Sequence, residues 1–190
     1  MNNIISISGN WDDGIILDKY VINSNFIGED AFGNPQFDTK YTPVGKLLHD
    51  MKYNGHYNTS QQIVDMYLGE IKKWITGKNI DIIIPVPPTE SRILQPVFSI
   101  GETLAGELSV FYNDKVLVKV GNQAAKSMSD DKKDLEGSIK QVLPAKRECN
   151  ILLIDDLYQT GKTANECVSV LRNDMLIKKI YYLGIAKTKK

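Results

Sequence analysis

The segment Ile151–Thr163 reads ILLIDDLYQTGKT, and it decides the fold class. Four apolar residues lead into the adjacent acids Asp155 and Asp156, and a short polar loop then precedes a helix predicted over residues 164–172. A continuous apolar run of this length is typical of a strand buried on both faces, as in a parallel sheet. Open α/β sheets bind ligands beyond the carboxyl ends of such strands. The segment therefore predicts a ligand site at this loop.

The loop Thr160–Thr163 is expected to lie at the start of the helix, where free N–H groups and the helix dipole favour an anion. Carboxylates beside an anion site are what a phosphorylated sugar requires. A Walker A loop is excluded, because it needs a glycine five residues before its Gly-Lys-Thr and Asp156 occupies that position. A Walker B strand would need a separate Walker A loop, which the chain lacks. The structural alternative is a buried strand whose acids cap the next helix.

The composition is that of an ordinary globular chain, with 190 residues, 42% hydrophobic and 24% charged. Lysine plus arginine and aspartate plus glutamate number 23 each, so net charge favours neither nucleic acid nor an anionic membrane. The apolar runs are too short to span a bilayer, and the first residues do not form a signal peptide, which predicts a cytoplasmic protein. Two distant cysteines support neither a zinc site nor a disulfide framework.

The order of predicted elements divides the chain at residue 78. Residues 1–78 form a small N-terminal β/α hood, with a β-rich segment and helices that begin at Thr42-Pro43 and Thr59-Ser60. Its aromatic residues are expected to attach a small sheet to the body: Trp11, Phe26, Phe32 and Phe37. Residues 79–190 alternate strands with helices and predict an α/β core, a parallel twisted sheet with flanking helices, in one compact unit with the hood. Its strands are expected around residues 82–86, 115–120, 151–154 and 180–186.

Two further loops are candidates for substrate contacts. The loop Pro87–Arg92 leaves the carboxyl end of a predicted strand and offers Pro87, Pro88, Thr89 and Arg92, with a structural proline-rich turn as the alternative. Residues 121–137 are polar and longer than most connections, as in loops that close over active sites. Lys119, just before this segment, and Lys126 within it are candidates to reach phosphate.

The segment Ile151–Thr163 resembles the phosphoribosyl pyrophosphate (PRPP) signature of the type I phosphoribosyltransferases. The resemblance implies their fold, with Asp155 and Asp156 as catalytic residues on the ribose hydroxyls and as indirect contacts of Mg²⁺ through those hydroxyls or water. It also implies that the loop after the acids wraps the 5-phosphate, through Tyr158, Gln159, Thr160, Gly161, Lys162 and Thr163. The loop at Pro87 would hold the pyrophosphate.

Within this family the chain looks most like the ComF-like group, over about three quarters of its length. The segments that carry the likeness, besides the acidic motif, are Tyr41–Tyr53, Ile84–Pro87, Phe98–Ala105 and Asp130–Gly137. The chain departs from that group in lacking a four-cysteine zinc module and in keeping only Arg92 as a basic residue in the pyrophosphate loop. Gln159 replaces an acid of purine salvage enzymes, which counts against a hypoxanthine-type base site.

The resemblance implies transfer of the phosphoribosyl group from PRPP to a nitrogen nucleophile, with Mg²⁺ as cofactor and release of pyrophosphate. The acceptor is not revealed by any pattern in residues 1–78. The alternative function is a non-catalytic PRPP or nucleotide sensor, or a ComF-like accessory protein in DNA uptake. A homodimer is expected from the resemblance alone.

Overall fold

The structure is a computed structural model that describes residues 3–55, 59–88, 95–120 and 138–188. These residues form strands β1 (Ile5–Ser6), β2 (Asp13–Lys19), β3 (Val21–Glu29), β4 (Pro35–Tyr41), β5 (Ile82–Pro85), β6 (Phe111–Tyr112), β7 (Leu117–Lys119), β8 (Ile139–Gln141), β9 (Cys149–Tyr158) and β10 (Ile177–Lys187). The helices are α1 (Pro43–Tyr53), α2 (Ser60–Ile75), α3 (Pro96–Leu108) and α4 (Lys162–Leu171).

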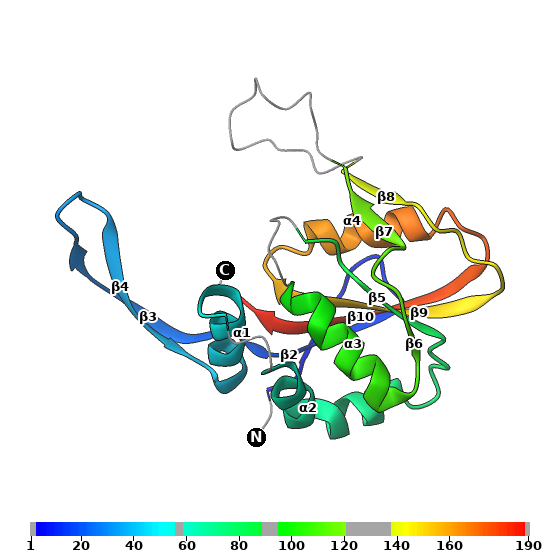
Figure 1. Cartoon of the computed structure of the whole chain (residues 1–190), viewed down its shortest axis with the longest axis horizontal. Coiled ribbons are helices and arrows are strands. Elements are labelled where there is room, and N and C mark those ends of the chain that lie inside the picture. Colours follow the sequence, from blue (N-terminus) through cyan, green and yellow to red (C-terminus); the bar gives the residue numbers. More distant parts are fainter. Residues whose placement is uncertain (1–2, 56–58, 89–94, 121–137, 189–190) are drawn as a thin grey trace.

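A central sheet organises the fold, with strand order β1-β2-β10-β9-β5-β6 (Figure 1). Strands β2, β10, β9, β5 and β6 run parallel to their neighbours, and only β1 is antiparallel. Parallel strands need crossover connections, and helices α3 and α4 lie in those between β5 and β6 and between β9 and β10. The predicted α/β class with a mostly parallel sheet and flanking helices is therefore confirmed.

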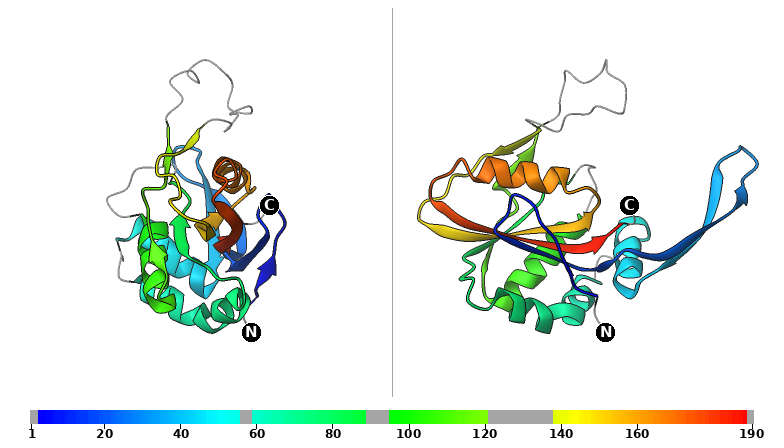
Figure 2. Two further views of the ribbon diagram at one scale, coloured as in Figure 1. Left: turned by 90° about the vertical axis from the view of Figure 1, so that its right-hand side faces the viewer. Right: turned by 180° about the vertical axis from the view of Figure 1, so that it is seen from behind.

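Side-chain alternation along β9 explains why helices cover both faces of the sheet. Leu152 and Ile154 belong to an apolar cluster with α1, α2 and α3, whereas Ile151 and Leu153 belong to a second cluster with α4. All four side chains are buried. Figures 1 and 2 show the two helical layers on opposite sides of the sheet. A strand buried on both faces reads as a continuous apolar run, which is why the sequence pattern identified it.

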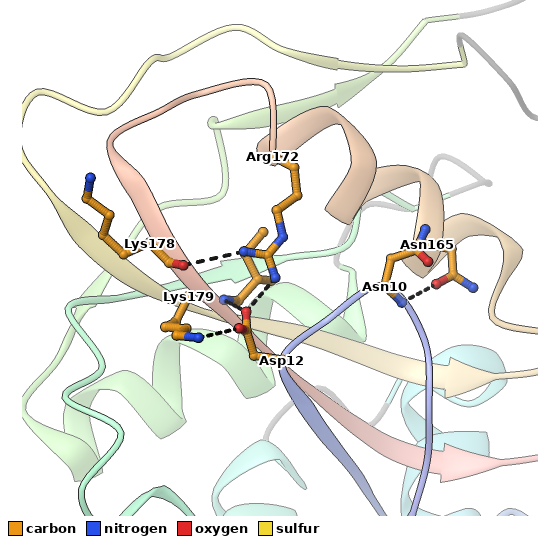
Figure 3. Close-up of polar contacts among 7 residues, drawn as sticks. Asn10, Asp12, Asn165, Arg172, Lys178 and Lys179 are labelled. Carbon is orange, nitrogen blue, oxygen red and sulfur yellow. Dashed lines mark hydrogen bonds and ion pairs between the residues drawn. The ribbon is translucent and has the colours of Figure 1, made fainter.

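The N-terminal segment is part of the central sheet. Strand β2 pairs with β10 over Asp13–Lys19, and the preceding turn is tied to α4 and β10 by polar contacts (Figure 3). The Asp12 carboxylate accepts hydrogen bonds from the Arg172 guanidinium, from Lys179 Nζ at 2.8 Å and from the Ile180 N–H at 2.9 Å. A boundary at residue 78 stays a prediction, but residues on both sides of it share one sheet.

The strand predicted at residues 115–120 does not join the parallel sheet. Strand β7 pairs antiparallel with β8, and β6 occupies the sheet edge beside β5 instead. Apolar residues of this ribbon, Val116, Leu117 and Ile139, are buried in the cluster that contains α4. A short apolar run predicts burial but does not specify which sheet the strand enters, and here the burial is against α4.

Strands β3 and β4 form a two-stranded arm (residues 21–41) that projects from the body (Figures 1 and 2). The prediction that aromatic residues of the hood attach a sheet to the body is right for Trp11, which is buried and stacks on Tyr182 at 4.6 Å between ring centroids. It is wrong for Phe26, Phe32 and Phe37, which are exposed on the arm. Aromatic and β-branched residues favour a strand, but they do not show whether a second layer covers it.

Helix α1 is fixed against the base of the arm by its first turn. The Thr42 hydroxyl accepts from the Gly45 N–H at 3.0 Å and donates to the Lys19 carbonyl at 2.6 Å, which confirms Thr42 as the predicted N-cap. Gly45 lies so close to the chain at β2 that a Cβ there would overlap the Tyr20 carbonyl oxygen. Because no side chain fits, glycine at this position sets the distance between α1 and the sheet.

We expect Gly45→Ala to lower the free energy of unfolding by about 2 kcal/mol or more, because the clash is with backbone that cannot move alone. The matched control is Gly69→Ala in α2, where a Cβ meets nothing within 4 Å. Replacing an unstrained helical glycine should stabilise the protein by about 0.5–1 kcal/mol. Urea denaturation of both variants measures the difference, and equal effects would contradict the proposed packing of α1.

Candidate functional site

A cavity of about 500 Å³ lies at the carboxyl end of the central sheet. Strand β5 stops pairing with β9 at Pro85 and Ile154, and the Val86 N–H then donates to the Ile154 carbonyl at 2.8 Å. Strand β9 continues to Tyr158, so its last residues extend past β5. The cavity occupies this step, lined by Lys52, Tyr53, Val86, Pro87, Pro88, Gln95, Val97, Lys119, Asp155, Asp156, Leu157, Gln159, Thr160, Gly161, Lys162, Thr163 and Ala164.

The two acids lie within β9, which continues to Tyr158, past the strand end expected at Ile154. Asp155 pairs in register with Gly184 of β10, and the pairing continues to Tyr158 and Lys187. Consecutive side chains of a strand point to opposite faces. Asp155 therefore points toward the α4 layer with Leu153, and Asp156 points toward the α1 layer with Ile154. Each acid consequently has a different partner.

Asp155 is held by a tyrosine of the neighbouring strand. The Tyr182 hydroxyl donates to Asp155 Oδ2 at 2.9 Å, and the Tyr182 ring is buried against Trp11. Burial and the adjacent Asp156 charge raise the pKa of Asp155 to about 6, although the Tyr182 hydrogen bond and Lys52 act in the opposite direction. Asp155 is thus an acid whose protonation changes just below neutral pH.

Asp156 is held by Lys52, which lies in the last turn of α1. Lys52 Nζ is 2.8 Å from Asp156 Oδ2, and the two side chains are only 10% and 18% exposed. Lys52 lies in the segment Tyr41–Tyr53 but was not predicted as a site residue, because no contact with a ligand was assigned to that segment. The available signal was its place next to Met51 on the buried stripe of α1, where a lysine must find a partner.

The loop that was predicted to bind an anion leads into the start of α4. Gly161 is the N-cap residue, with φ of +74°, a left-handed conformation that favours glycine. A Cβ at this position would also meet the Tyr158 hydroxyl at 2.6 Å. No acidic residue lies in the first turn of α4, and Lys162 begins the helix. The first N–H groups of the helix and the Lys162 ammonium therefore make the entrance to α4 attractive to a phosphate.

Tyr158 does not line the cavity, unlike its predicted neighbours in the loop. Its ring lies 6.0 Å from that of Tyr182 in an edge-to-face arrangement, and Lys187 Nζ lies 5.7 Å from its centroid. Tyr158 therefore supports the loop from below, by packing under Gly161. Its predicted contact with the 5-phosphate stays a prediction.

The structure brings three other predicted residues to the cavity, from separate parts of the chain. Pro87 and Pro88 line it after β5, and Lys119 lines it from the end of β7. Thr89, Arg92 and Lys126 lie outside the described residues. Glu166 of α4 fixes the start of β8 beside the cavity, because its carboxylate accepts from the N–H groups of Ser138 and Ile139 at 2.7 and 3.0 Å.

The donor set of the cavity fits a magnesium ion that is bound mainly by a substrate. Within the described parts of the chain no group of three or more His, Cys, Asp or Glu side chains could hold a metal ion. Asp155 and Asp156 are the carboxylates that line the cavity, and Asp156 already has Lys52 as a counter-charge. Mg²⁺ commonly keeps waters and uses one or two carboxylates together with substrate phosphates.

Among the described helices, none is both long and apolar enough to cross a membrane.

Comparison with protein-family models and with curated proteins finds no match. Among solved structures, the chain is similar to an adenine phosphoribosyltransferase with 19% identity, a TM-score of 0.41 and coverage of 85% of each chain. For the Saccharomyces cerevisiae adenine phosphoribosyltransferase, identity is 16%, the TM-score 0.45 and coverage 86% of this chain and 84% of that one. For the Leishmania tarentolae enzyme these values are 12%, 0.47, 97% and 94%. Likenesses at this level assign neither substrate nor activity.

We expect Asp155→Asn to stabilise the protein above pH 6. The native state keeps the Asp155 proton up to about pH 6, whereas an unfolded aspartate loses it near pH 3.9. The contribution of Asp155 to the unfolding free energy therefore falls as pH rises between these values. The variant should gain roughly 1–2 kcal/mol at pH 8, and this gain should shrink as the pH is lowered from 6 to 4.

Asp174→Asn is the control of opposite sign for that measurement. Hydrogen bonds from the Ala145 and Leu176 N–H groups and from Gln141 lower the pKa of Asp174. Its carboxylate thus stabilises the native state at neutral pH, and the loss caused by Asp174→Asn should shrink on acidification. Urea unfolding of both variants at pH 4, 6 and 8 gives the two slopes. Parallel slopes would refute the assignment of a raised pKa to Asp155.

A second prediction concerns the ion pair between Lys52 and Asp156. We expect Lys52→Met to destabilise the protein by about 1–3 kcal/mol, because Asp156 would be left half-buried without a counter-charge. Adding Asp156→Asn should recover most of the loss, with a coupling of at least about 1 kcal/mol in the double-mutant cycle. Lys46→Met is the control on the same helix, since its pair with Asp50 is screened by solvent and should contribute much less to stability. A coupling near zero would mean that the pair does not hold α1 to the site.

Proposed function

We propose that this protein is a phosphoribosyltransferase of the type I class that binds PRPP with Mg²⁺ and transfers the phosphoribosyl group to a nitrogen nucleophile. One observation carries the proposal. Two carboxylates of β9 and the N-terminus of α4, which is capped by Gly161, line the same cavity. A sugar phosphate presents hydroxyl donors at one end of such a cavity and an anion at the other. Carboxylates accept from the hydroxyls, and helix N–H groups donate to the phosphate.

In this proposal the substrate is oriented by the two acids of β9 and by the loop that follows the strand. Thr160, Gly161, Lys162 and Thr163 hold the 5-phosphate, while Asp155 and Asp156 accept hydrogen bonds from the ribose hydroxyls. The C1 end of the sugar then faces Pro87 and Pro88, where the pyrophosphate is placed. A charged hydrogen bond is worth roughly 1.5–3 kcal/mol. Several of them suffice for a micromolar dissociation constant, which needs about 8 kcal/mol.

The reaction forms a bond between the acceptor nitrogen and C1 and breaks the bond between C1 and the pyrophosphate oxygen. The electron pair of the broken bond leaves with pyrophosphate, and the acceptor nitrogen releases its proton to solvent. Positive charge develops on the ribose, next to the carboxylates of Asp155 and Asp156. Mg²⁺ supplies charge stabilisation to the pyrophosphate oxygens when it is bound. Lys119, at the cavity wall, is placed to offset further negative charge.

The second candidate is a non-catalytic sensor of PRPP or nucleotides, or a ComF-like accessory protein in DNA uptake, and the ion pair of Lys52 with Asp156 favours the sensor. An acid that already has a charged partner is a weaker acceptor for a ribose hydroxyl. Binding must then be coupled to a change at α1, which is what a sensor of PRPP or nucleotides requires. The two candidates share the site and differ only in whether pyrophosphate is released.

The binding site is tested by calorimetric titration of PRPP in the presence of Mg²⁺. We expect saturable binding to the wild-type chain and at least a 100-fold loss for Asp155→Asn combined with Asp156→Asn, because both hydroxyl acceptors lose their charge. Asp174→Asn, which changes an acid outside the cavity, should bind as the wild type does. Normal binding by the double variant would place the PRPP site elsewhere, and no binding at millimolar PRPP would reject both candidate functions.

Catalysis is tested by pyrophosphate release from PRPP with a panel of nucleobases and amines. Release that depends on one acceptor, and that the double aspartate variant lacks, supports the transferase. Saturable binding of PRPP without release for any acceptor supports the sensor.

A further inference from the structure

Lys52 is a buried cation in the wall of the candidate site, and it comes from α1 rather than from a loop that was predicted to bind phosphate. Its side chain is 10% exposed and lines the cavity together with Asp156, which lies 2.8 Å from the ammonium. The Lys52 charge also lowers the pKa of Asp155, so the ammonium lies close to both acids. Lys52 is therefore placed where the proposed ribose would bind.

The ion pair and the proposed ribose contact compete for the same carboxylate. In the proposed function Asp156 accepts from a ribose hydroxyl, yet a charged ammonium is a stronger donor than a neutral hydroxyl. Asp155 is engaged elsewhere, because it accepts from the Tyr182 hydroxyl on the α4 side of the sheet. A lysine this buried needs an anion. A ribose therefore displaces Lys52 at low cost only when another anion is offered to the ammonium.

The segment that is proposed to hold the pyrophosphate begins beside this ion pair. Pro85 of β5 pairs in register with Ile154 of β9. Pro87 and Asp156 each follow two residues later, and neighbouring strands lie about 4.8 Å apart. A lysine ammonium is carried on a flexible four-carbon stem. An ammonium paired with Asp156 is therefore within reach of a phosphate placed next to Pro87.

The described start of that segment, residues 86–88, has no free backbone donor for a pyrophosphate. Pro87 and Pro88 have no N–H group, and the Val86 N–H already donates to the Ile154 carbonyl at 2.8 Å. A pyrophosphate beside these prolines therefore depends on cations from other elements. Three lysines of the described residues line the cavity: Lys52, Lys119 and Lys162. Lys162 begins the helix that is proposed to hold the 5-phosphate, at the other end of the substrate.

We propose that Lys52 is a pyrophosphate ligand, which exchanges the Asp156 carboxylate for a substrate phosphate when PRPP binds. This inference rests on the proposed function. The ribose hydroxyls take over Asp156, and the Lys52 ammonium moves to a pyrophosphate oxygen. The exchange leaves neither buried ion without a partner, whereas displacement of Lys52 alone would do so. It also makes the site selective for PRPP over ribose 5-phosphate, which must displace Lys52 without offering it a phosphate at C1.

The first test compares PRPP with ribose 5-phosphate, each titrated calorimetrically with Mg²⁺ into the full-length chain. Lys52→Met should weaken PRPP binding at least about tenfold, through loss of one charge-assisted hydrogen bond. Ribose 5-phosphate should bind this variant at least as tightly as the wild type, because Asp156 is released. Lys52→Gln keeps an N–H donor for Asp156, so it protects the fold and should show the same loss of preference. Lys52→Arg keeps the charge and should retain most of the preference for PRPP.

Lys46→Met is the matched control, because it removes a lysine from the same helix and neither Lys46 nor its partner Asp50 lines the cavity. It should leave both dissociation constants unchanged. Equal changes for the two ligands in Lys52→Met and Lys52→Gln would overturn the inference, since Lys52 would then act only as a counter-charge. Unchanged constants in these variants would overturn it too. Failure of PRPP to bind the wild type would instead reject the proposed function itself.

The second test measures coupling between the two parts of the substrate. Magnesium pyrophosphate should draw Lys52 away from Asp156 and so favour the binding of ribose 5-phosphate. The dissociation constant of ribose 5-phosphate is measured with and without saturating pyrophosphate, for the wild type and for Lys52→Met. The coupling factor should be at least about fivefold more favourable in the wild type, because the variant has no ion pair to exchange. Equal coupling factors would overturn the exchange.

Discussion

The alternation of side chains along β9 is the constraint on which the site depends. It sends Asp155 and Asp156 to opposite faces of the sheet, so that one carboxylate belongs to the α4 layer and the other to the α1 layer. Neither could be left unpaired near a buried strand. Tyr182 of β10 donates a hydrogen bond from its hydroxyl to Asp155, whereas Lys52 of α1 forms an ion pair with Asp156. The two neighbouring acids therefore differ in the kind of group that holds them and in the element that supplies it.

This separation connects the cavity to the whole fold. Tyr182 is stacked on Trp11, which the N-terminal turn holds against the sheet. The position of the hydroxyl that donates to Asp155 therefore depends on the packing around β2 and β10. Asp156 is tied through Lys52 to α1, whose start is fixed by Thr42 and Gly45 at the base of the arm. The arm and the cavity thus lie at the two ends of one short helix. Helix α1 therefore lies between the base of the arm and the carboxylate that the proposed sugar would contact.

Much of the fold was predictable because it follows from local pattern. The parallel sheet follows from apolar runs that alternate with helices, and the N-cap at Thr42 follows from residue types with fixed preferences. Patterns failed where burial depends on a distant surface. The run at residues 115–120 entered an antiparallel ribbon on α4, and the aromatic residues of the arm face solvent. Both segments have residue types that favour strands, but residue type alone does not show which layer covers a strand.

The sequence by itself determined the acids of β9, the glycine at the start of α4 and the position of both at the end of a buried strand. These features are contiguous in the chain, and backbone geometry alone brings them together. Only the tertiary structure decided that Lys52 and Tyr182 hold the acids, because these residues reach the site from other elements across the packed sheet. It also decided that Tyr158 lies beneath the loop rather than in the cavity. The direction of a side chain at a strand end depends on the register with β10, which no local pattern records.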